Sequence, residues 1–429
     1  MEVKLELHNS LQGEIEVPGD KSISHRAVML GSIAEGTTEI SNFLDAKDPW
    51  STVNCMRSLG VEIDGEGSNL RVHGVGLQGL TEPQDVLDAG NSGTTIRLIS
   101  GILAGQDFHS VITGDNSLRR RPMGRIAQPL KEMGAKIDGR NGGNLAPLSI
   151  RGGSLKGIEY QLKVASAQVK SAILLAGLFA QGETVITEPG NSRDHTERML
   201  TGMGYPLKKE GRTVTLQGGH SLKGLKIRVP GDFSSAAFFM VAASIVEGSD
   251  LTIKGVGLNP TRTGLLKVLK EMGAEIKVAD ERLSGGEPVA DLMVKGSKLR
   301  AVEVGGDIIP TMIDEIPVLA VAAAVAEGKT VIRDAAELKV KESNRISTIA
   351  QELAKMGADI KELPDGLEIS GGRKLKGTVC HSHDDHRIAM ALAVASLVAE
   401  GETVITSWDS VEISFPGFLD LLKKCLAVQ

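Results

Sequence analysis

The sequence predicts an α/β protein in which one unit of strands and helices is repeated six times. Six apolar, helix-like stretches each run into a glycine and then a short β-branched strand. A second amphipathic stretch follows each strand, and the first five of these end in a Leu-Gly or Met-Gly pair. Glycine enters the left-handed conformation cheaply, so a glycine after an apolar stretch marks the end of a helix. The spacing of roughly 70 residues exceeds that of solenoid repeats. The first glycines are Gly36, Gly105, Gly182, Gly248, Gly328 and Gly401, and the second are Gly60, Gly134, Gly204, Gly273 and Gly357.

The six copies divide into two halves of three. Each first helix is expected after a cluster of small and polar residues, and Pro-Gly-Asp occurs in the first and fourth clusters. We therefore expect one domain over 19–229 and another over 1–18 plus 230–429, with a hinge near 17–21 and 229–232. The segment before Pro18 is predicted to be one short strand that joins the C-terminal half. The clusters lie at 18–22, 89–94, 165–168, 230–235, 310–314 and 382–387.

Composition excludes several classes of protein. A net charge of −6 argues against general nucleic-acid binding, and three scattered cysteines cannot form a disulfide framework or a cysteine-rich zinc site. The segment Met1–Leu5, a predicted strand that contains Glu2, is not expected to be a secretory or transit peptide. The longest apolar run, Ile316–Ala326, is too short to cross a bilayer. We expect a soluble, cytoplasmic monomer that needs no cofactor and no metal.

Cationic side chains gather at the predicted helix starts. Each alone is typical of a solvated surface charge, but helix N-termini also attract anions through their free N–H groups and dipole. If each half packs around a pseudo-threefold axis and the halves face each other, positive potential would focus between them. The expected ligands are small and strongly anionic. The cationic set comprises Lys21, Arg26, Arg97, Arg121, Arg193, Lys341, Arg345 and Arg387.

Two acidic residues stand out against this cationic set. Asp314 opens a predicted helix, and Glu342 lies between Lys341 and Arg345. Carboxylates facing cations at an anion site are candidates for proton transfer. The alternatives are a helix N-cap for Asp314 and an intrahelical salt bridge for Glu342.

Three other strings imitate known motifs. The glycines of 74–79 fit a dinucleotide-binding pattern, but no helix is expected to follow, so we predict a turn between strands. Gly328-Lys329-Thr330 lacks the first glycine of a phosphate-binding loop. The string 381–386 imitates a hydrolase metal site, but no further histidine follows it. Asp385 and His386 are instead expected to cap and orient the helix that carries Arg387.

Seven motifs, in order along the whole chain, resemble the 5-enolpyruvylshikimate-3-phosphate synthase family, in particular its class II bacterial branch. They lie at 18–26, 90–94, 120–122, 166–168, 192–197, 341–345 and 385–387. The resemblance implies a two-domain inside-out α/β barrel, the enolpyruvyl transferase fold, with six βαβαββ repeats, three per domain. It implies transfer of the enolpyruvyl group of phosphoenolpyruvate to the 5-hydroxyl of shikimate 3-phosphate, with release of phosphate, in aromatic amino acid biosynthesis.

The resemblance also implies roles for individual residues. Lys21, Asp314 and Glu342 would move protons. Asn91 and Thr94 would shape the turn around Gly93. Shikimate 3-phosphate would be held by Lys21, Ser22, Arg26, Ser166, Ala167, Gln168, Arg193, Asp314 and Lys341. Phosphoenolpyruvate would be held by Lys21, Gly93, Arg121, Gln168, Arg345 and Arg387.

The sequence departs from the family pattern at three positions. Ile413 replaces a Lys that in some members helps hold phosphoenolpyruvate, so that contact should be absent. Glu337 replaces an Asn, and Ala167 replaces a Ser and can offer only its backbone. Gly93 leaves room where tolerant members often carry Ala, which predicts sensitivity to glyphosate.

Two alternative functions remain at this point. The sister enzyme transfers enolpyruvyl to UDP-N-acetylglucosamine and usually carries a Cys in the loop before the Pro-initiated helix. Here that loop, 115–122, has none. A non-catalytic anion-binding protein of the same fold is disfavoured by the retained Lys21, Asp314 and Glu342.

Overall fold

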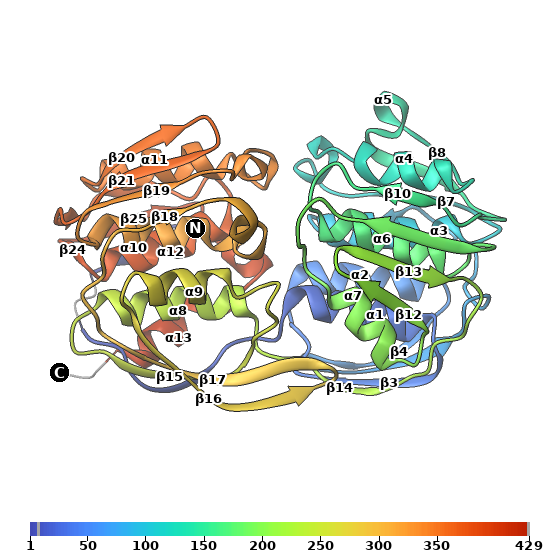
Figure 1. Ribbon diagram of the computed structural model, residues 1–429, viewed down its shortest axis with the longest axis horizontal. Coiled ribbons are helices and arrows are strands. Elements are labelled where there is room, and N and C mark those ends of the chain that lie inside the picture. The colour runs from blue at the N-terminus through green and yellow to red at the C-terminus, as the bar shows by residue number, and fades with distance from the viewer. Residues whose placement is uncertain (7–8, 427–429) are drawn as a thin grey trace. The chain divides into compact units, whose positions relative to one another are not determined.

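The computed structural model describes residues 1–6 and 9–426, and the chain forms two compact units (Figure 1). The N-terminal unit comprises Gly19–Val229 together with Ser284–Glu287, and the C-terminal unit comprises the rest. Within the described residues, no helix has the length and apolar character that a membrane span requires.

The N-terminal unit contains three copies of a helix–strand–helix–hairpin pattern. The first copy consists of α1 (Lys21–Ser32), β3 (Glu35–Ser41), α2 (Lys47–Ser58), β4 (Glu62–Glu66) and β5 (Asn69–Val75). The second consists of β6 (Leu87–Asp88), α3 (Gly93–Ala104), β7 (His109–Thr113), α4 (Gly124–Glu132), β8 (Lys136–Gly139), the short turn α5 (Arg140–Gly143) and β9 (Leu145–Arg151). The third consists of β10 (Glu159–Gln161), α6 (Ala167–Gly177), β11 (Glu183–Thr187), α7 (His195–Gly202), β12 (Leu207–Glu210) and β13 (Thr213–Gln217), followed by β14 (Lys226–Arg228).

Each copy of the N-terminal unit builds one four-stranded sheet of mixed direction. In the third copy, β11 pairs parallel with β10 and antiparallel with β13, and β12 completes the hairpin. The first copy has no strand of its own before α1 in this unit. Its parallel partner is β14, which pairs with β3 from Lys226↔Glu39 to Arg228↔Ser41. The end of the third copy therefore closes onto the first.

The C-terminal unit repeats the pattern twice in full and once with β1, from the start of the chain, in place of the hairpin. The fourth copy consists of β2 (Gln12–Glu16), α8 (Phe233–Ile245), β15 (Asp250–Gly257), α9 (Gly264–Glu271), β16 (Glu275–Ser284) and β17 (Glu287–Lys295). The fifth consists of β18 (Glu303–Val304), α10 (Ile316–Val325), β19 (Lys329–Ile332), α11 (Arg345–Lys355), β20 (Asp359–Leu363) and β21 (Gly366–Ser370). The sixth consists of β22 (Leu375–Lys376), β23 (Val379–His381), α12 (His386–Ser396), β24 (Ala399–Glu400), β25 (Thr403–Thr406) and α13 (Phe418–Cys425).

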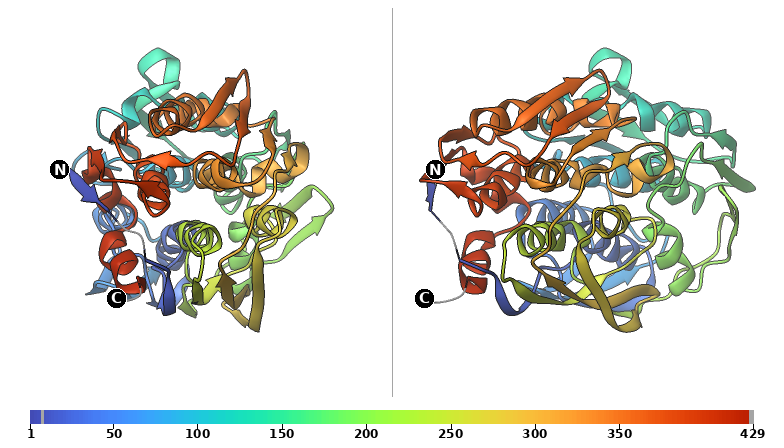
Figure 2. Two further views of the ribbon diagram at one scale, coloured as in Figure 1. Left: turned by 90° about the vertical axis from the view of Figure 1, so that its left-hand side faces the viewer. Right: turned by 60° about the vertical axis from the view of Figure 1, so that its left-hand side comes forward.

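The start of the chain supplies two strands to the C-terminal unit, where the sequence analysis expected one. Strand β1 (Val3–Leu5) pairs antiparallel with β25, and Figure 2 shows it beside the C-terminal segments. Strand β2 pairs parallel with β15. The expectation was wrong because Gly13, at a φ of +89°, and two exposed Glu residues make the second strand look like a polar loop.

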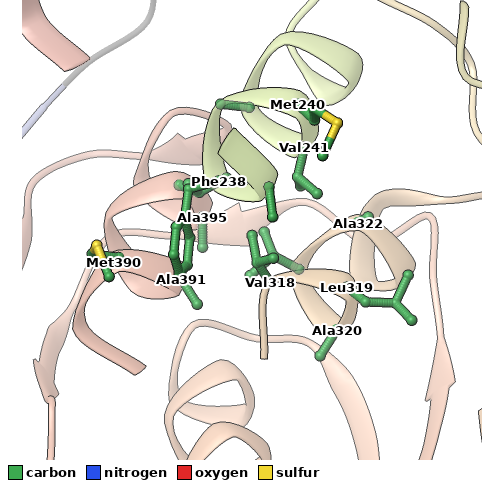
Figure 3. Packing of buried hydrophobic residues seen from close by; sticks show 14 of the residues in the cluster. Phe238, Met240, Val241, Val318, Leu319, Ala320, Ala322, Met390, Ala391 and Ala395 are labelled. Atoms are coloured by element: carbon green, nitrogen blue, oxygen red, sulfur yellow. The ribbon is translucent and has the colours of Figure 1, made fainter. Parts of the chain in front are cut away.

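Three inner helices form the core of the C-terminal unit. Helices α8, α10 and α12 pack against one another through residues such as Phe238, Val318 and Ala391 (Figure 3). In α10 every residue from Ile316 to Ala324 is buried. A helix that is apolar on all sides belongs inside a core, and its many alanines let the neighbouring helices approach closely. In the N-terminal unit, α3 packs against both α1 and α6 in the same way.

The glycine signals located the helix ends well. All five glycines of the second set have positive φ, and so do five of the first set. Gly105 is the exception, with a φ of −87°, because it ends α3 in a right-handed conformation. Its backbone N–H donates to the carbonyl oxygens of Ile102 and Leu103. The six first helices and the six second helices lie where the repeat predicts them.

Candidate active site

Helix α1 carries three of the predicted site residues within its first two turns. Lys21 begins the helix, and its Nζ lies 3.2 Å from a carboxylate oxygen of Asp48. The Asp20 side chain caps the helix by accepting a hydrogen bond from the backbone N–H of Ile23. Lys21 is partly exposed, with 21% of its side chain accessible, so it can reach a ligand from a fixed helix start.

Arg26 is buried, whereas a lone cation of this kind is typical of a solvated surface. It is 4% exposed, and its guanidinium donates to Thr196 Oγ1 at 2.7 Å, Ser171 Oγ at 2.8 Å and the Ser22 carbonyl at 2.9 Å. Burial lowers the pKa of Arg26 to about 10, against the opposing pull of Glu197 and Asp20. The side chain is thereby held in one orientation between α1, α6 and α7.

The start of α3 is joined to the start of α6 by a chain of hydrogen bonds. Nη1 of Arg97 donates to Oε1 of Gln168 at 2.6 Å, and Nε2 of Gln168 donates to Thr94 Oγ1 at 3.1 Å. Arg121 donates to Oδ1 of Asn91 at 2.8 Å, on the turn before Gly93. A Cβ built on Gly93 would lie 2.9 Å from Nη1 of Arg97 and 3.4 Å from Nη1 of Arg121. Gly93, Arg121 and Gln168 therefore form one cluster.

The remaining predicted site residues of the N-terminal unit lie at the start of helix α6 and in the loop before α7. Ser166 is the N-cap of α6 and accepts from the backbone N–H of Val169, while Ala167 is the first residue of the helix. Arg193 lies in the loop after β11, and its charge contributes to the lowered pKa of Arg26. The guanidinium groups of Arg26 and Arg193 are thus near enough to interact. Such a pair of cations suits an anionic ligand.

The C-terminal unit contains a second cluster, built around Arg345 at the start of α11. The Arg345 guanidinium binds three carboxylates, which come from three different segments of the chain. Nε lies 2.8 Å from Asp385, Nη1 lies 3.1 Å from Asp314, and Nη2 lies 2.6 Å from Glu342. Lys341 reaches the same oxygen of Asp314 at 3.3 Å. The proton-carrier candidates Asp314 and Glu342 thus share one buried arginine.

Arg345 is permanently charged in this cluster. It is 1% exposed, and burial alone would lower its pKa, but the charges of Asp385, Glu342 and Asp314 outweigh burial and raise the pKa. Asp385 also caps α12 by accepting from the backbone N–H of Arg387 at 3.0 Å, as the sequence analysis expected. One aspartate therefore fixes both Arg345 and the helix that carries Arg387.

Arg387 faces a second buried carboxylate. Its Nη1 lies 3.9 Å from Glu315, which is 1% exposed and begins α10 as its N-cap residue. Asp314 is consequently not the N-cap of α10 but part of the short 3₁₀ turn Ile313–Glu315 before it. Glu342 precedes α11, so its salt bridge with Arg345 forms ahead of the helix and not within it.

Sequence reasoning missed two acidic residues that pair with predicted site cations. Asp48 and Glu315 were not singled out, although each adjoins a helix start, where a carboxylate is favourable. The histidines of 381–386 proved to be engaged within the fold: His383 Nε2 contacts Glu352 at 2.8 Å, and His381 Nδ1 accepts from the N–H of His383. In the part of the chain that the structure describes, one group of potential metal ligands lies close together, the exposed Glu62, Asp64 and His73.

Comparison with known proteins gives consistent results. The model of the family described as EPSP synthase (3-phosphoshikimate 1-carboxyvinyltransferase) matches residues 5–422. A 3-phosphoshikimate 1-carboxyvinyltransferase of Desulforamulus reducens is 58% identical over 99% of this chain and 100% of its own. The enzyme of that name from Pelotomaculum thermopropionicum is 60% identical over 99% of each chain. A solved EPSP synthase structure from Acinetobacter baumannii has a TM-score of 0.90 and 49% identity, covering 99% of this chain and 98% of that one.

Proposed function

The chain belongs to the EPSP synthase family, and from that premise we propose how its residues carry out the reaction of the family. The reaction transfers the enolpyruvyl group of phosphoenolpyruvate to the 5-hydroxyl of shikimate 3-phosphate and releases phosphate. The fold is the two-domain inside-out α/β barrel of that family. We propose that the two compact units are its two domains and that 17–21 and 229–232 form the hinge.

Shikimate 3-phosphate carries a phosphate, a carboxylate and hydroxyl groups, so its proposed site combines cations with hydrogen-bonding residues. A mobile Lys such as Lys21 suits a phosphate as a point charge, whereas a planar guanidinium such as that of Arg193 grips two oxygens at once. Arg26 would support this site from its buried position. The proposed ligands are Lys21, Ser22, Arg26, Ser166, Ala167, Gln168, Arg193, Asp314 and Lys341.

Phosphoenolpyruvate needs a more concentrated set of cations, because its phosphate and carboxylate lie on one carbon. Gly93 supplies the space that a side chain would fill, beside the guanidinium of Arg121. Arg345 and Arg387 would take the remaining oxygens. The proposed ligands are Lys21, Gly93, Arg121, Gln168, Arg345 and Arg387.

The chemistry proceeds by addition and elimination through a tetrahedral ketal. The 5-hydroxyl oxygen bonds to C2 of phosphoenolpyruvate as it loses its proton, and C3 gains a proton. Phosphate then leaves C2 as C3 gives up a proton, which restores the double bond. We propose that Lys21, Asp314 and Glu342 move these protons, while the arginines stabilise the charge that develops on the phosphate.

One observation supports this assignment most directly. Asp314 and Glu342 contact the same guanidinium, at 3.1 Å and 2.6 Å, so two carboxylates lie where an anionic substrate would bind. A substrate oxygen arriving at Arg345 would compete with these carboxylates and could release one of them for proton transfer. Substrate binding would then determine which carboxylate stays paired with Arg345 and which is available to carry a proton.

A phosphate-release assay tests the function. The purified protein is mixed with phosphoenolpyruvate and either shikimate 3-phosphate or UDP-N-acetylglucosamine, and free phosphate is measured. We expect release with shikimate 3-phosphate alone. Release with only the nucleotide sugar would overturn the assignment, and no release with either acceptor would favour a non-catalytic anion-binding protein.

A further inference from the structure

A lysine of α6 is fully buried among charges that the proposed reaction does not use. Nζ of Lys170 lies 2.7 Å from Glu188 and 2.6 Å from Glu197, and the side chains of all three are at most 4% exposed. Taking three charges out of water is costly unless their geometry is good, and such groups are often replaceable by apolar residues without loss of stability. Stability alone is therefore a weak reason for this group to be here.

The two carboxylates stand at the two ends of one loop. Glu188 directly follows β11, Glu197 lies in the first turn of α7, and Arg193 lies between them. By holding both acids with one ammonium group, Lys170 fixes the two points where the loop leaves the body of the unit. The loop is thereby closed by a single buried cation.

The residues on either side of Arg193 are held as well. Ser192 donates a hydrogen bond from its hydroxyl to Glu188. The carboxylate of Asp194 binds Arg198 at 2.9 Å and Lys209 at 3.1 Å. Ser192 and Asp194 are buried, whereas Arg193 is half-buried. The loop thus presents Arg193 from a backbone that is pinned on both sides.

Ser171, the next residue of α6, connects helices α6 and α7 to Arg26. Ser171 bonds Thr196 at 2.7 Å and accepts from Arg26 at 2.8 Å. Burial would lower the pKa of Lys170, but Glu197 and Glu188 outweigh it and raise the pKa, so the lysine stays charged. A charged, fully buried lysine serves as an anchor and not as a base.

We propose that Lys170, through Glu188 and Glu197, is a positioning residue for shikimate 3-phosphate, holding the loop so that Arg193 meets the substrate in a fixed orientation. This inference rests on the proposed role of Arg193. A guanidinium supported in this way binds without first losing the freedom of its loop, which strengthens binding. None of the residues proposed to hold phosphoenolpyruvate lies in this loop, so we expect the effect to be confined to shikimate 3-phosphate.

The first test is Lys170→Met, measured by steady-state kinetics with each substrate varied in turn. We expect the KM for shikimate 3-phosphate to rise about tenfold or more, as for other residues that support a ligand-binding group, with the KM for phosphoenolpyruvate unchanged. Lys208→Met is the matched control, because Lys208 pairs with Glu210 on the surface of the same unit and is 69% exposed. It should leave both constants unchanged.

Lys170→Met leaves two buried carboxylates uncompensated, and such a variant can fail to fold. The triple variant Lys170→Met, Glu188→Gln, Glu197→Gln removes all three charges together, and its folding is checked by circular dichroism. We expect it to show the same selective rise in KM. A folded triple variant with the parent KM for shikimate 3-phosphate, or with an equal rise for both substrates, would overturn the inference.

A double-mutant cycle with Arg193→Ala separates this inference from the proposed function. If Lys170 acts through Arg193, adding Lys170→Met to Arg193→Ala raises the KM for shikimate 3-phosphate no further. Full additivity of the two changes would overturn the inference while leaving the role of Arg193 intact. An unchanged KM in Arg193→Ala itself would instead overturn the proposed role of Arg193, and this inference with it.

Discussion

Nη2 of Arg345 lies 2.6 Å from Oε2 of Glu342, although Glu342 precedes the helix that Arg345 begins. The pair is thus formed by the chain entering α11 and not by helical spacing. The carboxylate is partly exposed, at 22%, whereas the guanidinium is buried. Glu342 can therefore move toward a substrate while its partner stays in place.

Glu342→Gln should abolish most turnover while substrate binding is retained. The amide keeps the shape of the side chain but cannot donate or accept the proton, and loss of a general acid or base costs about 100-fold or more in kcat. The measurement is kcat by phosphate release, with binding of phosphoenolpyruvate followed by calorimetry. Glu400→Gln, in an exposed pair with Lys374, is the matched control and should retain full activity. Parent-level turnover in Glu342→Gln would refute a catalytic role.

Asp385→Ala should destabilise the C-terminal unit strongly. The aspartate is fully buried, binds Arg345 through both oxygens and caps α12. Removing one partner of a buried pair costs up to about 3–5 kcal/mol, and Asp314 and Glu342, which still pair with Arg345, reduce that cost here. Losing an N-cap alone costs about 1 kcal/mol. Ser92→Ala, which removes the cap of α3 and a hydrogen bond with the Thr95 hydroxyl but breaks no ion pair, is the comparison. Urea denaturation of both variants measures the difference, and equal losses would show that the ion pair adds nothing.

Glyphosate should inhibit the enzyme, and Gly93→Ala should relieve the inhibition. A methyl group there would lie 2.9 Å from Nη1 of Arg97, closer than side chains normally approach. Nη1 is the end of a flexible side chain, so Arg97 can shift to make room, and the cost falls at the lower end of that for overpacking. The KM for phosphoenolpyruvate should therefore rise by no more than about tenfold. Phosphate release is measured over a range of inhibitor concentrations. Full activity of the unaltered enzyme in millimolar glyphosate would contradict the prediction.

His25 should make the N-terminal unit less stable in mild acid. Burial, and then the charges of Lys21 and Arg26, hold its pKa well below the ordinary value, while Nδ1 contacts Thr52 at 2.7 Å. The unfolded chain takes up a proton below about pH 6.5, but the folded unit does not. Stability is therefore lost as the pH falls below that value, by up to about 1.4 kcal/mol per pH unit.

The variant His25→Gln isolates this effect. Its free energy of unfolding should depend less on pH between 7 and the folded-state pKa than that of the parent, as measured by urea denaturation at several pH values. The exposed His220→Gln serves as the control and should keep the pH dependence of the parent. An unaltered slope in His25→Gln would assign the acid sensitivity to other groups.

Much of the fold could be predicted from the sequence because the same local signals occur six times. Each glycine after an apolar stretch marks one helix end, and agreement among the copies compensates for the weakness of any single signal. Strand β2 was missed because its side chains are mostly exposed, so no apolar alternation reveals it. Its place is set by pairing with β15, far along the chain.

The cations at the helix starts and two of their acidic partners, Asp314 and Glu342, could be predicted from the sequence, but the other partners could not. Lys21 and Arg345 stand out because they occupy helix starts. Asp48 and Lys170 lie on segments distant from their partners in sequence, and only the packing of separate elements brings each pair together. Periodicity predicts one helix or strand at a time, so it does not predict which elements contact each other.

The pairing of β1 with β25 has a consequence for the order in which the protein is made. Val3–Leu5 leave the ribosome long before their partner strand, Thr403–Thr406, is synthesised. The segment 19–229 can fold as it emerges, since domains generally fold as units during synthesis. Strand β1 must therefore wait for its partner until Thr403–Thr406 has been translated, whereas β2 needs only β15. The pairing of β1 with β25 is therefore completed late, although β1 is made early.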